Sequence, residues 1–150
     1  MYHLLLQSPV GPLTLSGTAE AVTALSFGAA PGAEEDACPL LEQAARELEE
    51  YFQRRRRRFT VPLAPAGTPF QQRVWAELRK IPFGATASYG EIAARIGNPR
   101  ACRAVGMANH RNPIAILIPC HRVVGRSGGL VGYAGGLEIK RALLELEGIL

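Results

Sequence analysis

Three short apolar-rich segments open the chain, at residues 2–8, 13–18 and 21–27, and turn-forming residues separate them. This pattern predicts an antiparallel meander. A small, acidic loop follows at residues 28–36. Beyond it, apolar residues within positions 40–52 fall on one face of a helix and glutamates on the other. We therefore expect a helix that covers one face of the small sheet.

A second helical pattern begins after residues 61–67, where two prolines and a glycine predict a linker. Thr68 and Gln71 form a capping box, and Pro69 occupies the first turn, where its missing N–H costs nothing. The helix is expected to end before Pro82. We expect its buried side chains to be Phe70, Val74, Trp75, Leu78 and Ile81.

Two short helices are predicted next, joined by a tight turn. Ser88 and Glu91 form a capping box, Gly97 closes the first helix, and Asn98 starts a second one through Asn109. This is a helix-turn-helix pattern. Small side chains and two arginines suit close approach to a nucleic-acid backbone, although an αα-hairpin packed on the core explains the small residues equally well. The residues concerned are Arg100, Ala101, Arg103 and Ala104.

Residues 114–125 are mostly apolar and β-branched, which predicts a buried strand that carries Cys120 at its tip. His121 and Arg122 follow the thiol, and two cations there would favour the reactive thiolate. Cys120 is therefore either a nucleophile or a packing residue. Because successive side chains of a strand face opposite ways, His121 reaches the thiol only if the chain turns at Pro119 or a water relays the proton.

The last pattern is a helix over residues 137–147, closed by Gly148. Its residues available for the core are Leu137, Leu143, Leu144 and Leu146. Glycine-rich loops at residues 125–129 and 132–136 precede it and surround Tyr133. They are too irregular for a phosphate-binding loop, but they can bring backbone amides close to a flat ligand.

The net charge of +4 is unevenly distributed. From Pro69 onward there are eleven Lys and Arg against five Glu, whereas the part before it has six Arg against eight acids. A basic second half fits a nucleic-acid surface. Residues 54–58 are five consecutive arginines. We interpret them as side chains that complement the preceding helix end and line a solvated loop, with a DNA-binding arm as the alternative.

The three cysteines, Cys38, Cys102 and Cys120, lack paired spacing, which argues against a disulfide framework and a zinc site. No apolar run approaches the roughly 20 residues that span a bilayer. The start of the chain also lacks a signal-peptide pattern. We therefore expect a cytoplasmic protein without a membrane partner.

The pentapeptide from Pro119 to Val123, Pro-Cys-His-Arg-Val, resembles the active-site signature of the O6-alkylguanine-DNA alkyltransferases, or methylated-DNA–protein-cysteine methyltransferases. The N-terminal part resembles this family only loosely. Further blocks in family order extend the resemblance, at residues 67–75, 88–92, 103–106, 112–113 and 132–136.

The expected fold class is α/β (α+β): a small N-terminal antiparallel sheet with a helix, linked to a mostly helical domain that contains the helix-turn-helix. The resemblance implies a ribonuclease H-like domain over residues 1–66. It implies a DNA-binding and alkyl-acceptor domain over residues 67–150.

The resemblance also implies irreversible, single-turnover transfer of an alkyl group from O6 of guanine to the protein's own cysteine. Neither a metal nor an organic cofactor takes part. Cys120 matches the acceptor, and Asn112 matches the asparagine that orders the turn around it. His121 and Glu147 match the proton-relay pair, with a water between histidine and cysteine. Glu147 would then orient His121, which accepts the thiol proton.

The implied partner is double-stranded DNA with an alkylated guanine, bound through the minor groove by a monomer. The base must be rotated out of the duplex. Arg103 matches the arginine that fills the vacated place, and Tyr89 matches the tyrosine that crowds the 3′ phosphate and reaches the base. Small residues such as Ala101 and Ala104 suit a minor-groove helix. Activity on O4-alkylthymine stays open.

The implied pocket around the flipped guanine consists of Tyr89, Val123, Tyr133 and the backbone of Ala134 and Gly135. Many relatives have serine in place of Ala134. Backbone N–H groups would therefore replace the lost hydrogen bond to the O6 oxygen.

Three alternative functions fit these residues less well. A lesion-binding relative without chemistry would lack the cysteine that this chain has. A helix-turn-helix regulator would not require Cys120, His121 and Glu147 together, and a thiol hydrolase would need an oxyanion hole, which the sequence does not identify. The sequence therefore predicts single-turnover dealkylation of damaged DNA.

Overall fold

The structure is a computed structural model that describes residues 1–29, 36–126, 128–130, 133 and 135–150. The chain forms two compact units. The first contains Met1–Ala66 and Pro113–Leu117, and the second contains Gly67–Asn112 and Ile118–Leu150. Within the described ranges, none of the helices is long and apolar enough to cross a membrane.

The sheet of the first unit has three antiparallel strands, β1 (Tyr2–Leu6), β2 (Leu13–Gly17) and β3 (Val22–Phe27), in the order β1-β2-β3. Leu15 of the central strand pairs with Leu4 on one side and Leu25 on the other. These three leucines are buried. The predicted meander is confirmed, because the apolar segments and the turns between them fix both strands and register.

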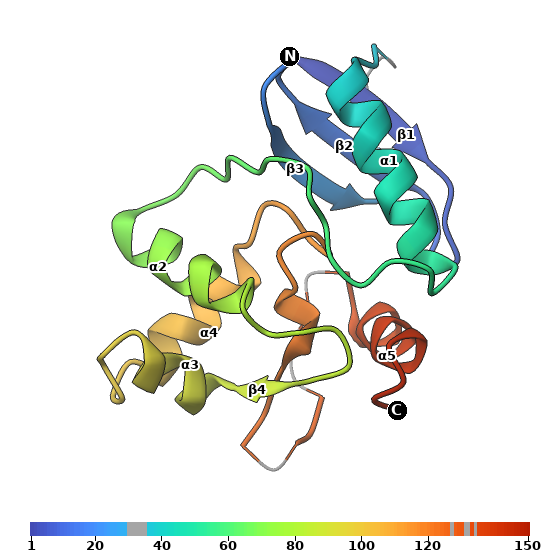
Figure 1. Cartoon of the computed structure of the whole chain (residues 1–150). Helices are drawn as coiled ribbons and strands as arrows, with labels where there is room; N and C mark the ends of the chain where they lie inside the picture. Colours follow the sequence, from blue (N-terminus) through green and yellow to red (C-terminus); the bar gives the residue numbers. More distant parts are fainter. Residues whose placement is uncertain (30–35, 127, 131–132, 134) are drawn as a thin grey trace. The chain divides into compact units, whose positions relative to one another are not determined.

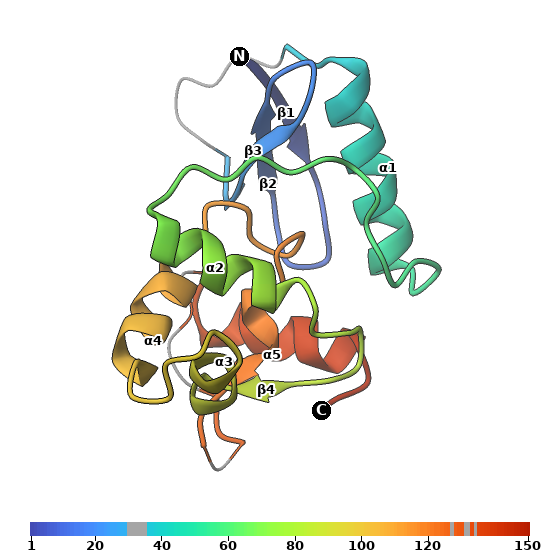
Figure 2. The same ribbon diagram turned by 60° about the vertical axis from the view of Figure 1, so that its left-hand side comes forward.

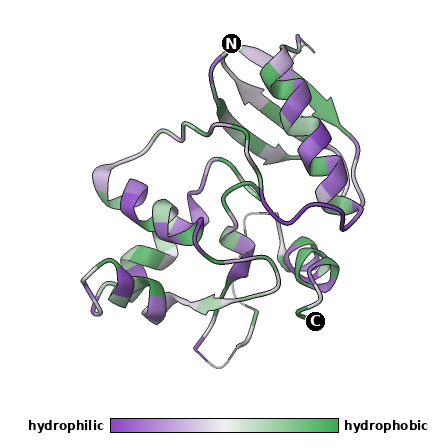
Figure 3. Ribbon diagram, viewed as in Figure 1, coloured by the Kyte–Doolittle hydropathy of each residue, from purple (hydrophilic) through white to green (hydrophobic). Residues whose placement is uncertain are grey.

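Helix α1 (Pro39–Phe52) lies across one face of this sheet (Figures 1 and 2). Hydrophobic and hydrophilic bands alternate along it (Figure 3), as the sequence pattern predicted. Leu41, Ala44, Leu48 and Tyr51 are fully buried. Pro39 stands at the start, where a proline needs no hydrogen-bond partner.

The five arginines at residues 54–58 lie in the hydrophilic loop that follows α1 (Figure 3). The N–H of Arg54 donates to the carbonyl of Tyr51, and the N–H of Arg55 donates to that of Glu50. Arg54 takes the left-handed conformation with φ 60°. The arginines thus follow the helix end in a loop, as the first interpretation predicted, and backbone N–H groups satisfy the last helical carbonyls.

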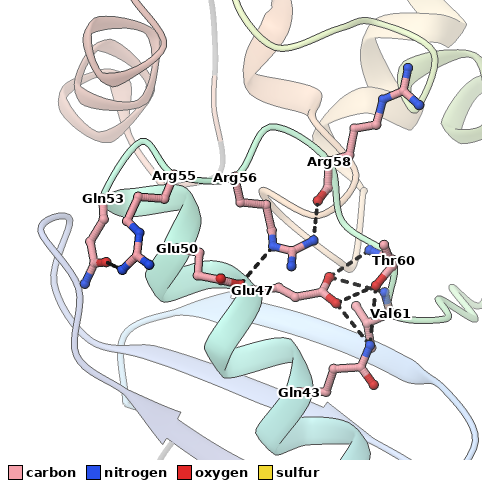
Figure 4. A network of polar contacts seen from close by, with 9 residues as sticks. All are labelled: Gln43, Glu47, Glu50, Gln53, Arg55, Arg56, Arg58, Thr60 and Val61. Carbon is pink, nitrogen blue, oxygen red and sulfur yellow. Dashed lines mark hydrogen bonds and ion pairs between the residues drawn. The ribbon is translucent and has the colours of Figure 1, made fainter.

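A buried carboxylate, that of Glu47 on α1, fixes the far end of this loop (Figure 4). It accepts hydrogen bonds from the Thr60 N–H at 2.7 Å, the Thr60 hydroxyl at 2.6 Å, the Val61 N–H at 3.3 Å and the Gln43 amide at 3.0 Å. Burial alone would raise the pKa of Glu47. The hydrogen bonds from Thr60, Gln43 and Val61 outweigh burial and lower that pKa below 4.5.

We expect Glu47→Gln to lower the free energy of unfolding by about 1–3 kcal/mol, because hydrogen bonds to a charged group are lost. The exposed neighbour Glu49→Gln is the matched control. Since the pKa of Glu47 is depressed in the folded state, its contribution is present above pH 4.5 and is lost as the pH falls through the folded value. Urea unfolding from pH 7 to pH 3 should show the free energies of unfolding of the wild type and of Glu47→Gln converging at the acid end. A constant difference between these two free energies would contradict this account.

The second unit begins with α2 (Pro69–Leu78). Both hydrogen bonds of the predicted capping box between Thr68 and Gln71 are present. Trp75 is a core residue, as expected, and its indole N–H donates to the carbonyl of Ala108 at 2.8 Å. Gly67 is required here because a Cβ would collide with the Trp75 ring.

The helix-turn-helix consists of α3 (Tyr89–Arg95) and α4 (Cys102–His110). The Ser88 hydroxyl caps α3 by accepting the Glu91 N–H. Gly97, with φ 81°, ends it as predicted. The second helix begins later than expected, because Asn98–Ala101 form a turn closed by the Ala101 N–H and the Asn98 carbonyl. Arg100 and Ala101 therefore lie in that turn and not on the helix.

The predicted strand over residues 114–125 is wrong. The residues from Ile114 to Val124 are buried, and among the described residues the bridge they form with the first sheet is a parallel one between Ile114 and Leu25. Ile116 has φ 68°, which breaks an extended conformation. Beyond Pro119 the chain enters a turn of 3-10 helix, η1 (Cys120–Arg122). Apolar periodicity indicated burial correctly but could not specify the backbone.

Two short strands complete the second unit: β4 (Ala87–Ser88) and β5 (Val123–Val124), which pair in parallel. Helix α5 (Leu137–Leu146) follows. Its Leu143 and Leu144 are buried as expected, but Leu137 is 49% exposed. Lys140 takes a core position on the same face instead. Gly148, with φ 80°, lies just beyond the end of this helix, as predicted.

Candidate active site

Cys120 is the first residue of η1 and is 5% exposed. The chain turns at Pro119, whose φ of −80° and ψ of 64° leave the extended region. This is one of the two routes that the sequence left open for His121. The thiol therefore sits in a tight buried turn and not at the tip of a strand.

Burial raises the pKa of the Cys120 thiol above its ordinary value of 9.0. Hydrogen bonds from the side chains of Asn112 and Tyr133 and the positive charge of Lys140 oppose this effect. The resting thiol is therefore protonated at neutral pH. Its ionisation needs a base, because the surrounding groups only partly offset the cost of a buried thiolate.

Lys140 is the cation beside the thiol, a position the sequence had assigned to His121 and Arg122. Its side chain is fully buried, and its ammonium donates to the carbonyl of Val123 at 2.6 Å. Burial lowers the pKa of Lys140, and the charge of Cys120 acts in the opposite direction. A lysine and a thiolate that lie close together stabilise each other's charged forms.

His121 and Arg122 both contact the carboxylate of Glu147, at the end of α5. The His121 Nε2 lies 2.6 Å from one carboxylate oxygen. Arg122 donates to both oxygens, at 2.8 Å and 3.1 Å, and to the carbonyl of Ile81 at 2.7 Å. Burial alone would raise the pKa of Glu147, but the contacts with His121 and Arg122 lower it to about 2. The carboxylate is therefore ionised throughout the physiological range.

Burial lowers the pKa of His121 below 6.5, against the opposing hydrogen bond and charge of Glu147. The ring is therefore neutral at pH 7. Because Nε2 faces the carboxylate, the proton is assigned to Nε2 and the lone pair to Nδ1. Nδ1 has no hydrogen-bond partner among the described residues. This nitrogen is the one able to accept a proton.

Two asparagines hold the backbone around Cys120. The Asn112 amide donates to the carbonyl of Ile118 at 2.8 Å, and the Asn109 amide donates to the carbonyl of Cys120 at 3.4 Å. The Asn112 side chain also lowers the pKa of the Cys120 thiol. Asn112 thus lies where the sequence predicted it, at the turn that carries the cysteine.

Tyr89, the first residue of α3, also reaches this site. Burial and the charge of Cys120 raise the pKa of its hydroxyl, while a hydrogen bond with Asn109 opposes the shift. Its ring packs on α4, where a Cβ on Gly106 would lie 3.8 Å from it. The described pocket candidates also include Val123 and Tyr133, which are buried, and Gly135, which is half-buried. Ala134 lies outside the described residues.

The predicted DNA-binding side chains form a separate group at the surface of the helix-turn-helix. Arg100, Arg103 and Ala104 are exposed, and Ala101 is half-buried. The described part of the chain holds no group of three or more His, Cys, Asp and Glu side chains that could bind a metal ion.

Sequence reasoning missed Lys140 and Asn109, and it gave Arg122 the wrong contact. A signal was present for the first two. Lys140 and Glu147 lie on the α5 face that buries Leu143 and Leu144, and Asn109 lies on the α4 face that buries Val105 and Ala108. A polar residue on an apolar stripe costs stability unless it has partners, so it marks a site.

Comparison with known proteins gives the same two-part picture. Residues 69–149 match the family model described as 6-O-methylguanine DNA methyltransferase, DNA binding domain, and residues 1–65 match its ribonuclease-like domain. A methylated-DNA–protein-cysteine methyltransferase of Methanosarcina acetivorans is 49% identical, over 99% of each chain. The constitutive enzyme of that name from Bacillus subtilis is 41% identical, over 99% of this chain and 96% of its own.

Among solved structures, Mycobacterium tuberculosis OGT in complex with DNA matches with a TM-score of 0.90 and 49% identity, over 98% of this chain and 92% of that one. These findings define a DNA-repair methyltransferase, with α+β architecture and DNA as its partner. The chain belongs to the 6-O-methylguanine DNA methyltransferase family, which confirms the resemblance seen in the sequence.

We expect Glu147→Gln to lower the free energy of unfolding by about 3–5 kcal/mol, because it leaves Arg122 buried without its counter-charge. Arg122→Gln should have a similar effect. The double variant should be destabilised by less than the sum of the two, since neither buried charge remains alone. Glu145→Gln, an exposed change on the same helix, is the control.

The pH dependence of the stability lost in Glu147→Gln follows from the depressed pKa of Glu147. The contribution of Glu147 is fully present above pH 4.5 and is lost as the pH falls toward about 2. Denaturant unfolding of the wild type, the two single variants, the double variant and Glu145→Gln at pH 7 and pH 3 measures both effects. Strictly additive single changes would show that the two side chains do not act as a pair.

Proposed function

We propose that this protein repairs duplex DNA by transferring the alkyl group of O6-alkylguanine to Sγ of Cys120, in a single turnover. A carbon–sulfur bond forms as the carbon–oxygen bond breaks, the thiol proton passes to His121, and the released guanine takes up a proton. The observation that carries the proposal is a buried Cys120 beside a neutral His121, which is oriented by the ionised Glu147. The product is a thioether, and a single acceptor sulfur is thereby consumed.

In this mechanism Glu147 and Arg122 act through His121. The carboxylate fixes the Nε2 tautomer, so that Nδ1 accepts the thiol proton, through a water where the distance requires one. It also stabilises the imidazolium that forms. The charge of Lys140 then favours the thiolate at the moment of attack. Arg122 keeps the carboxylate ionised and in place.

We propose further that the helix-turn-helix binds in the minor groove as a monomer. The base is rotated out of the duplex, Arg103 fills its place, and Tyr89 crowds the 3′ phosphate. Arg100, Ala101 and Ala104 contact the backbone at the same surface. Exposure of Arg100, Arg103 and Ala104 supports this assignment, because small and basic side chains allow close approach to phosphates.

The flipped guanine would lie against Tyr89, Val123, Tyr133 and the Ala134–Gly135 backbone. Tyr133 supports this position because it is buried and its side chain lowers the pKa of the Cys120 thiol. Residues 1–66 then form the ribonuclease-like domain and residues 67–150 the alkyl-acceptor domain. A DNA-binding protein without chemistry is not favoured, because the full-length relatives are named as methyltransferases.

The direct test is to incubate the protein with a duplex that carries one O6-methylguanine and to weigh its peptides. We expect one methyl group on the peptide that contains Cys120. Cys102→Ser, which removes the exposed cysteine, should still accept the methyl group, whereas Cys120→Ser should not. A methyl group on another peptide, or none at all, would overturn the proposal.

Replacing His121, the proposed general base, should change both the rate of methyl transfer and the pH dependence of that rate. We expect His121→Gln to slow methyl transfer by about 10²–10⁴-fold, the usual contribution of a general base. Wild-type transfer should be constant once His121 is neutral, at and above pH 6.5, and should fall at lower pH.

Transfer by His121→Gln should instead rise continuously toward pH 9, because the thiol pKa is raised above 9.0 and hydroxide must replace the imidazole. Rapid-quench measurements from pH 5 to pH 9 give both profiles. His3→Gln, in the first unit, is the control. An unchanged profile for His121→Gln would contradict the assignment of the base.

A further inference from the structure

The mechanism leaves one strongly charged feature without a use: the five arginines at residues 54–58, here called the arginine loop. Four of them, Arg54, Arg55, Arg57 and Arg58, are exposed, and Arg56 is half-buried. The loop belongs to the first unit, which carries none of the catalytic side chains.

The backbone of the arginine loop is held at both ends. At its start, the N–H groups of Arg54 and Arg55 bond to the last turn of α1. At its end, Thr60 is fixed by two hydrogen bonds to the buried Glu47 (Figure 4). The guanidiniums therefore project from a short fixed segment, and less conformational entropy is lost when they bind a partner.

Two charges of the arginine loop, those of Arg55 and Arg58, form no ion pair with a described carboxylate. Arg56 pairs with Glu50 at 3.0 Å and also donates to the carbonyl of Arg58. Arg55 donates to the neutral amide of Gln53, and in Figure 4 the Arg58 side chain extends away from α1. A helix end attracts cations only through a partial charge of about one half. Five adjacent like charges repel one another, so an anionic partner would relieve that repulsion.

The chemistry of the loop favours phosphate groups. Arginine presents a planar fork that matches two phosphate oxygens, and duplex DNA presents phosphates at regular, short spacing. Binding to an anionic membrane surface usually adds apolar side chains that enter the bilayer. The adjacent aromatic residue, Phe59, instead packs against Tyr51, with ring centroids 5.4 Å apart.

We propose that the arginine loop is a second, sequence-independent contact for the phosphate backbone of DNA, distinct from the helix-turn-helix. This inference rests on DNA being the partner, as in the proposed function. On this proposal the arginine loop increases the affinity for any DNA, damaged or undamaged. It takes no part in recognition of the lesion or in the chemistry.

The test compares two triple variants of the exposed side chains: R55Q/R57Q/R58Q and the charge-preserving R55K/R57K/R58K. Arg54 and Arg56 stay unchanged because of their backbone conformation and ion pair. Binding to an undamaged duplex is measured from 50 to 200 mM salt. If three phosphate contacts are lost, the slope of log affinity against log salt falls by about 2.7 in the Gln variant.

Over this fourfold change in salt, the wild type should therefore lose about 40-fold more affinity than the Gln variant. The Lys variant should keep most of the wild-type slope. Methyl transfer from the free O6-methylguanine base should be equal in all three proteins. The Gln variant should unfold at a temperature no lower than the wild type, since it loses part of the repulsion between the arginines. An unchanged slope in the Gln variant overturns the proposal, as does an equal loss in the Lys and Gln variants.

Two further arms separate this inference from its alternatives. If the Gln variant loses binding to vesicles of anionic lipid while its slope on DNA is unchanged, the loop is a membrane contact and the proposal fails. If the wild type binds DNA through the loop but does not methylate Cys120, the proposed function fails while the loop contact stands. If the wild type methylates Cys120 with no change in slope for the Gln variant, only the loop contact fails.

Discussion

The buried carboxylate of Glu147 is the interaction on which the second unit depends. It lies at the end of α5 and accepts hydrogen bonds from His121, from Arg122 and from the N–H of Gly84 at 3.2 Å. An isolated carboxylate in this position would be strongly unfavourable. The contacts that satisfy it therefore hold three distant segments together. The same contacts set the tautomer of His121, so the fold and the chemistry have one common origin.

The environment of Cys120 combines protection with reactivity. Burial keeps the thiol protonated and shields it from solvent oxidants, since susceptibility to oxidation follows exposure and thiolate character. In the proposed reaction, the neutral His121 and the charge of Lys140 provide the reactivity. For the proposed single-turnover reaction, this arrangement keeps the sulfur protonated until a base removes its proton.

Much of the fold follows from short-range patterns. The strands of the meander, α1 and α2 were placed correctly because apolar period and capping residues act over a few positions. The capping box from Thr68 to Gln71 and the terminating Gly97 and Gly148 are examples. The sequence also proposed Cys120 and His121 as site residues, through a resemblance carried by motifs over about the C-terminal half. Neither period nor motif indicated that the apolar run after Asn112 turns back on itself.

The sequence by itself therefore determined the helices and the strands of the meander, whose patterns are local, and the residue types that are available for chemistry. Only the tertiary structure decided their partners: Arg122 with Glu147 instead of the thiol, and Lys140 beside Cys120. The physical reason is that a buried charge takes whichever counter-charge is brought close by packing of residues far apart in the chain. Hydrophobic pattern reports burial, whereas the direction of the backbone and the pairing of charges depend on the assembled core.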